Sequence, residues 1–124
     1  MKCLHIITPV KDSIDSTLET VKAIMESDIL VPFTYTVYND FSTEENTHRL
    51  EEAARQWNFR LVNLSDLTDH PSPNYLLVLQ TAQKEAIEAD AGLLIVESDV
   101  IVKKNTLQSL YNGALQQLSL IHIS

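Results

Sequence analysis

The apolar run Gly92–Val96 constrains the fold of this chain more than any other feature. It contains four consecutive aliphatic residues and lacks the polar face that an amphipathic helix needs. A continuous run of this kind is typical of a strand buried on both faces of a parallel sheet. Two carboxylates, Glu97 and Asp99, follow it directly. Because open α/β folds bind ligands at the carboxyl ends of their strands, the sequence predicts a site at these two acids.

Strand signals and amphipathic helical stripes alternate along the rest of the chain. Helices are predicted after Ser13, after Ser42, from Tyr75 and after Asn105. The earlier strands are predicted at Cys3–Thr8, Phe33–Tyr38 and Phe59–Val62. This alternation predicts an α/β fold, a three-layer sandwich with a mainly parallel, Rossmann-like sheet.

Local signals predict where several of these elements begin and end. Pro9 lacks a backbone donor, so we expect it to end the first strand. Asp12 or Ser13 is predicted to cap the first helix, and Ser42 with Glu45 forms a predicted capping box for the second. The longest irregular connection is 65–74, and long loops inside compact domains are often functional or mobile.

Composition excludes several classes of protein. A chain of 124 residues has room for one domain. Its formal net charge of −8 argues against a nucleic-acid binder, which needs clustered Lys and Arg. Cys3 is the single cysteine, so no intramolecular disulfide can form, and a reducing compartment is expected. No apolar stretch is long enough for a transmembrane segment and no leader pattern is present, so we expect a cytoplasmic protein.

A parallel sheet would bring the polar residues that follow its strands to one edge. These are Thr8 and Pro9, Asn39 and Asp40, and Glu97 and Asp99. Carboxylates gathered there would repel one another unless a cation were present, and oxygen ligands suit Mg²⁺ or Mn²⁺. The chain has two glycines and no glycine-rich phosphate loop, which disfavours a P-loop or a dinucleotide fold. The alternative for Glu97 and Asp99 is a pair of solvated loop acids.

Three segments together resemble the nucleotide-sugar-binding segments of family 2 glycosyltransferases. They are Ile6–Lys11 with its following helix, Val37–Thr43, and Leu94–Val100, and they occur in the family's order and span most of the chain. The resemblance implies the A-type glycosyltransferase fold. It also implies transfer of a hexosyl or related sugar from a nucleoside diphosphate donor to an acceptor hydroxyl, with inversion.

The same resemblance implies roles for individual residues. Thr8 and Pro9 would line the base and ribose site, Asp40 would contact the nucleoside, and Asp99 with Glu97 would hold Mg²⁺ or Mn²⁺ as a D-x-D-like pair. The nucleotide-sugar-binding residues that it implies are Thr8, Pro9, Val10, Asn39, Asp40, Ser42, Glu97 and Asp99.

The chain departs from the family pattern in several places. Phe41 stands where the family has glycine, Glu97 replaces the first aspartate of the pair, and Asn39 replaces a carboxylate. Residues 1–118 are interpreted as the donor-binding half, and 119–124 as an atypical tail that suggests truncation. No catalytic base is identified, and the resemblance assigns it, with the acceptor site, to a further C-terminal half. The alternatives are a receiver-like regulatory module that binds a metal ion, and an inactive fragment.

Overall fold

The computed structural model describes residues 2–99, 104–114 and 120–123. Within these residues, five parallel strands form one sheet in the order β3-β2-β1-β4-β5. The strands are β1 (Cys3–Val10), β2 (Phe33–Asn39), β3 (Arg60–Asn63), β4 (Ala91–Val96) and β5 (Leu120–Ile123). The helices are α1 (Ile14–Met25), α2 (Glu44–Trp57), α3 (Tyr75–Glu88) and α4 (Thr106–Ala114), with a short 3₁₀ turn, η1, at Leu64–Asp66.

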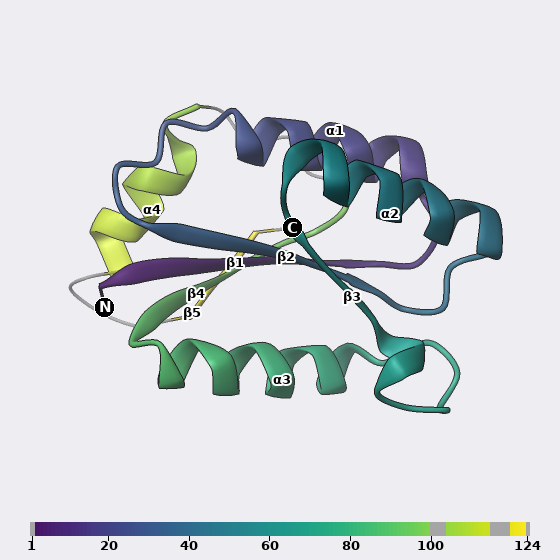
Figure 1. The fold of residues 1–124 in the computed structure, drawn as a ribbon. Coiled ribbons are helices and arrows are strands. Elements are labelled where there is room, and N and C mark those ends of the chain that lie inside the picture. The colour runs from purple at the N-terminus through teal and green to yellow at the C-terminus, as the bar shows by residue number, and fades with distance from the viewer. Residues whose placement is uncertain (1, 100–103, 115–119, 124) are drawn as a thin grey trace.

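The sheet is the middle of three layers (Figure 1). Helices α1, α2 and α4 cover one face and α3 covers the other. Strand β4 is buried along its whole length. Its Leu94 and Val96 pack into the first hydrophobic cluster, whereas Leu93 and Ile95 pack into the second. The predicted α/β fold and the doubly buried strand are therefore confirmed.

The strand order reverses at β1, which creates a place for a ligand. The chain passes from β1 to β2 and β3 on one side, then crosses to β4 on the other side. The ladder between β1 and β2 continues to the pair Val10–Asn39, whereas the ladder between β1 and β4 ends at Ile7–Ile95. Beyond Ile7, β1 therefore lacks a partner on the β4 side. Open sheets bind ligands in the crevice at such a reversal.

Two local predictions were wrong, and a third was right in position only. Pro9 lies inside β1, paired with Tyr38, and it is tolerated because β1 has no β4 ladder at that position. The N-cap of α2 is Thr43, whose hydroxyl accepts from the backbone N–H of Asn46, so Ser42 and Glu45 do not form the capping box. Ser13 is the N-cap residue of α1, one of the two predicted positions, but it has a left-handed conformation and its side chain makes no capping hydrogen bond.

The end of the chain contributes to the sheet. Leu120–Ile123 pairs in parallel with β4, from Leu93–Leu120 to Val96–Ile123. The sequence interpretation treated this segment as part of an atypical tail and did not predict a strand there. The boundary drawn between residues 118 and 119, and residues 100–103 after the acidic pair, lie outside the described residues.

Candidate functional site

A cavity of about 190 Å³ lies at the carboxyl ends of β1, β2 and β4, where the strand order reverses. We call it the strand-end pocket. Strand ends supply part of its wall, and the loop that leads into α3 supplies the rest. Its lining residues are Pro9, Val10, Lys11, Asp40, Ser72, Pro73, Tyr75, Val78 and Glu97. Four residues predicted from the sequence therefore meet here, namely Pro9, Val10, Asp40 and Glu97.

Asp40 fastens the loop before α3 to the end of β2. Its carboxylate accepts hydrogen bonds from the Ser72 hydroxyl at 2.9 Å, from the Asn74 backbone N–H at 2.8 Å and from the Asn74 amide at 2.8 Å. Its own backbone N–H donates to the Val10 carbonyl at 2.7 Å, which joins the ends of β1 and β2. Asp40 is only 8% exposed. The predicted nucleoside-binding acid is thus also a structural clamp.

The acidic pair lies on a turn after β4 that α1 supports. The hydroxyl of Thr20, a fully buried residue of α1, lies 3.0 Å from the carbonyl oxygen of Ser98, between the two acids. Glu97 is half-buried and lines the strand-end pocket, whereas Asp99 is exposed and lies outside the pocket lining. Burial and the negative charge of Glu97 together raise the pKa of the Tyr75 phenol. The charge of Glu97 therefore acts on Tyr75, and both residues line the strand-end pocket.

Three predicted site residues make contacts within the protein and do not line the pocket. Thr8 is fully buried, and its hydroxyl accepts a 2.8 Å hydrogen bond from Tyr35. The amide of Asn39 donates to the side chains of Thr47 and Asn63. The hydroxyl of Ser42 accepts from the backbone N–H of Asp12 at 2.7 Å. Thr8 thus joins β1 to β2, Asn39 joins β2 to α2 and β3, and Ser42 joins the loops after β1 and β2.

Hydrogen bonds link the loops that follow β1 and β2, next to the strand-end pocket. The Asp12 carboxylate accepts from the Thr43 backbone N–H at 2.8 Å and from the Asn46 amide at 3.1 Å. The hydrogen bond from Thr43 makes the largest contribution to lowering the pKa of Asp12. Phe41 belongs to the loop after β2. Its φ of 61° is a left-handed conformation that glycine would adopt without strain. The chain thus keeps a glycine-like backbone at a position occupied by a bulky side chain.

Sequence reasoning missed several residues of the pocket. Lys11 is the basic residue of the lining, and its ammonium group donates to the Phe41 carbonyl and lies 3.9 Å from the Asp12 carboxylate. Ser72 and Tyr75 come from the 65–74 connection and the helix start that follows it. The length of that connection was the one sequence signal that indicated a functional loop.

The carboxylates do not by themselves complete a metal site. Among residues 2–99, 104–114 and 120–123, no group of three or more His, Cys, Asp or Glu side chains lies close enough together to hold a metal ion. The same residues contain no helix with the length and apolarity needed to cross a membrane. Any cation at Glu97 and Asp99 would need oxygen ligands besides these two carboxylates.

Comparisons with known proteins identify a shared fold. No family model matches the chain, and no curated protein matches it. Among solved structures, S. aureus TarS, a glycosyltransferase, superposes with a TM-score of 0.68 at 23% identity, over 94% of this chain and 20% of that chain. TarS 1-349 in complex with UDP-GlcNAc gives a TM-score of 0.63 at 22% identity, over 94% of this chain and 32% of that one.

The complex of TarS 1-349 with UDP gives a TM-score of 0.63 at 21% identity, again over 94% and 32% of the two chains. The chain therefore spans between a fifth and a third of the lengths of these structures. At this level of identity the likeness establishes the fold alone. The chain has the α/β fold found in part of a glycosyltransferase.

Proposed function

We propose that this chain is the nucleotide-sugar-binding portion of an inverting glycosyltransferase, which transfers a hexosyl or related sugar to an acceptor hydroxyl. The observation that carries the proposal is the strand-end pocket, which combines Asp40 and Glu97 at the reversal of a parallel sheet. The shared fold supports it, because the solved complexes of TarS 1-349 contain UDP-GlcNAc and UDP. The three sequence segments that resemble family 2 glycosyltransferases converge on the same edge.

The pocket suits part of a nucleotide sugar. Sites for whole ligands commonly measure roughly 300–1,000 Å³, and the strand-end pocket has about 190 Å³. We infer that it receives the nucleoside, while the diphosphate and sugar lie outside it, along Glu97 and Asp99. Lys11 provides a positive charge at the pocket wall that would attract the diphosphate.

Asp40 retains the capacity for the proposed nucleoside contact. An ionised carboxylate offers about four acceptor positions. Ser72 and the Asn74 backbone occupy Oδ2, and the Asn74 amide occupies one position on Oδ1. One acceptor position on Oδ1 is therefore left for a donor group of the nucleoside. The clamp holds the carboxylate in one orientation, which reduces the entropy lost on binding.

Glu97 and Asp99 fit a Mg²⁺ or Mn²⁺ ion that shares its coordination with the donor diphosphate. Mg²⁺ is usually held by one or two carboxylates together with substrate phosphates, so the pair need not form a complete cage. Bound there, the cation would neutralise charge on the departing nucleoside diphosphate. Asp99, the exposed member, is the proposed principal ligand, and the contact between Thr20 and Ser98 holds the turn. The acceptor site and the catalytic base are proposed to belong to a longer glycosyltransferase polypeptide.

The test measures thermal unfolding with UDP, with and without Mn²⁺. We expect UDP to raise the melting temperature by several degrees when Mn²⁺ is present, because saturating ligand stabilises the folded state by about 2–3 kcal/mol. Asp99→Asn should lose that shift and keep the melting temperature of the unliganded chain, whereas Asp66→Asn, at an exposed position outside the pocket, should keep both. An equal rise in melting temperature with UDP in the presence of EDTA would contradict the proposed metal role. An unchanged melting temperature with every nucleoside diphosphate would contradict the proposed function.

A further inference from the structure

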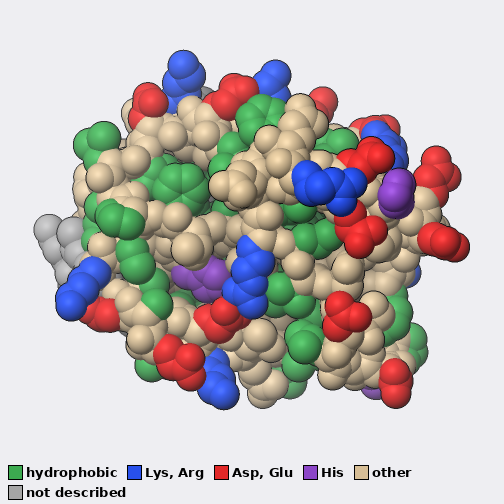
Figure 2. Space-filling model, viewed as in Figure 1, with side chains coloured by type: hydrophobic (Ala, Val, Ile, Leu, Met, Phe, Trp, Pro, Cys, Tyr) green, Lys and Arg blue, Asp and Glu red, His purple; other side chains and the backbone are tan. Residues whose placement is uncertain are grey.

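A second, larger cavity lies at the amino ends of β1, β2 and β3, and α3 forms part of its wall. It measures about 530 Å³, and we call it the α3-face cavity. Its lining includes His5 of β1, Thr34 and Thr36 of β2, and Arg60 of β3, with Glu85 contributed by α3. None of its lining residues lines the strand-end pocket. In Figure 2 a histidine side chain is visible between the sheet and α3, with basic and acidic side chains beside it.

Two residues that line this cavity each have a buried polar atom that lacks a hydrogen-bond partner within the described residues. These atoms are Nε2 of His5, a residue that is 6% exposed, and Oγ1 of Thr36, which is fully buried. The other ring nitrogen of His5, Nδ1, lies 2.7 Å from the hydroxyl of Thr34. The pairings His5–Thr34 and Ile7–Thr36 bring the two residues close together on adjacent strands. Since buried polar atoms are nearly always paired, two exceptions among residues that line one cavity indicate a missing partner.

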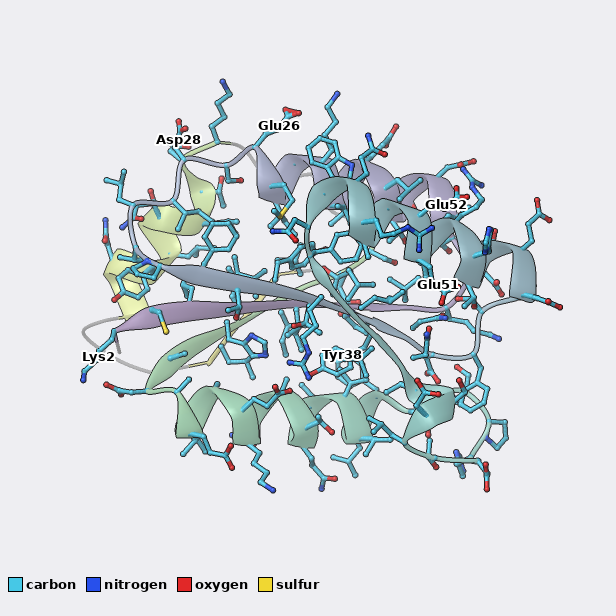
Figure 3. All side chains as sticks on the ribbon, viewed as in Figure 1. Lys2, Glu26, Asp28, Tyr38, Glu51 and Glu52 are labelled. Carbon is cyan, nitrogen blue, oxygen red and sulfur yellow. The ribbon has the colours of Figure 1, made fainter. Side chains whose placement is uncertain are left out.

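The charges around the cavity favour an uncharged ligand. Arg60 and Glu85 form an ion pair at 2.6 Å, and Glu85 also accepts from the hydroxyl of Tyr38 at 3.2 Å. Tyr38 projects from the sheet toward α3 (Figure 3). Burial holds the pKa of His5 below its ordinary value, so its imidazole is neutral at physiological pH. The two charges therefore neutralise each other, and the unpartnered atoms belong to neutral groups.

We propose that the α3-face cavity binds a neutral, largely apolar small molecule whose hydroxyl or amide group hydrogen-bonds to His5 Nε2 and Thr36 Oγ1. A hydroxyl suits both atoms because it donates and accepts. The apolar body would lie against Ala89 and Ala91, which also line the cavity. The volume falls within the range of roughly 300–1,000 Å³ that is common for small-molecule sites.

The test compares p-cresol with toluene, which has the same methylated ring without the hydroxyl. We expect p-cresol to produce saturable chemical-shift changes in the ¹⁵N-labelled chain, at the amides of His5, Thr36 and Arg60. Toluene should bind about three- to tenfold more weakly, the effect of losing one neutral hydrogen bond. Equal affinity for the two probes would overturn the polar recognition. The absence of saturable changes would mean that water alone occupies the cavity, and would overturn the proposal.

Two variants separate recognition from folding. Thr36→Val should weaken p-cresol binding about three- to tenfold and leave toluene binding unchanged, since the shape is kept and the hydroxyl is lost. Thr17→Val, at an equally buried threonine on α1, is the matched control and should change neither affinity. If Thr36→Val does not fold, Ala89→Trp at the exposed cavity edge should abolish binding by filling the space. Unchanged p-cresol affinity in either test variant would refute the site.

A competition experiment distinguishes this site from the strand-end pocket. Saturating UDP with Mn²⁺ should leave the p-cresol affinity unchanged, because the two cavities share no lining residue. Displacement of p-cresol by UDP would assign the probe to the nucleotide site and would contradict the inference.

Discussion

Asn74 donates two hydrogen bonds to Asp40, one from its backbone and one from its side chain, each 2.8 Å long. The two residues are 34 positions apart, so this contact ties the loop before α3 to the end of β2. Asp40→Asn would replace one carboxylate oxygen with an amide group that cannot accept. At least one of the three donors from Ser72 and Asn74 would then be buried without a partner.

We therefore expect Asp40→Asn to lower the free energy of unfolding by about 1–3 kcal/mol, the penalty of an unpaired buried polar group. Urea unfolding checks this value. The control is Asp66→Asn, an exposed aspartate on η1 whose replacement should change stability by less than about 0.5 kcal/mol. Equal stability of the two variants would remove the structural role assigned to Asp40.

Thr20→Val tests whether α1 positions the acidic turn. The variant keeps the shape of a fully buried side chain and removes the hydroxyl that lies 3.0 Å from the Ser98 carbonyl. We expect affinity for UDP with Mn²⁺ to fall several-fold, because Asp99 would be held less firmly. Isothermal titration calorimetry measures the change.

Thr17→Val is the control for this measurement, since the Thr17 hydroxyl donates its hydrogen bond locally, to the backbone carbonyl of the N-cap residue Ser13. Both variants should lose about 1 kcal/mol of stability. Equal nucleotide affinity in the two would mean that the Thr20 contact does not position the site.

Thr43→Ala and Glu45→Ala distinguish the observed cap of α2 from the predicted one. Thr43 accepts from the Asn46 backbone N–H, so its removal should cost about 0.5–2 kcal/mol. Glu45 is exposed in the first turn, and its removal should change stability by less than about 0.5 kcal/mol. Chemical unfolding of both variants gives the comparison, and a larger loss for Glu45→Ala would restore the capping box.

Acid should destabilise the chain through His5. Burial holds the pKa of His5 in the folded state below the ordinary value of 6.5. The unfolded chain therefore binds a proton more readily, and the free energy of unfolding falls as pH drops through 6.5 toward the lower, folded-state value. Urea titrations between about pH 4.5 and 8 should show this decline in the native chain and a flatter profile in His5→Gln.

His48→Gln, which removes a histidine from the exposed surface of α2, is the control. A second decrease in the free energy of unfolding, caused by protonation of Glu85, should follow at lower pH. Burial acts to raise the pKa of Glu85, but its hydrogen bond and ion pair with Arg60 outweigh burial and lower it below 4.5. If the stability of His5→Gln fell as steeply as that of the native chain just below pH 6.5, a group other than His5 would cause the decline there.

Strands β1 to β4 and helices α1 to α4 could be predicted because each depends on a local apolar pattern, whereas β5 was not predicted. β4 is the clearest case, since its unbroken apolar run matches its burial on both faces. The caps could not be predicted in the same way. Ser42 and Thr43 are both favourable capping residues by sequence. In the structure the Ser42 hydroxyl accepts a hydrogen bond from the backbone N–H of Asp12, which lies 30 residues earlier. Local signals do not contain such long-range contacts.

Part of the candidate site could be predicted from the order of the strands, and the rest depends on contacts between distant parts of the chain. Chain order and parallel topology indicated that Asp40 and Glu97 would lie at one edge. Thr8 was assigned to the ligand, yet it lies on the same sheet face as Ile6 and Val10, whose side chains enter the core beneath α1 and α2. The two-residue period of a strand could have assigned Thr8 to that buried face. Ser72 and Tyr75 required knowledge of how the 65–74 loop folds back.

The hydrogen bonds around the strand-end pocket have a consequence for the order of folding. They join Asp12 to Thr43, Asp40 to Asn74 and Thr20 to Ser98, across 31, 34 and 78 residues. Closing longer loops costs more chain entropy, so contacts of this kind form after local helices and turns. The pocket is therefore completed only when distant parts of the chain have docked. Nucleotide binding at this edge would then report that β1, β2 and β4 have assembled with α1 and α3.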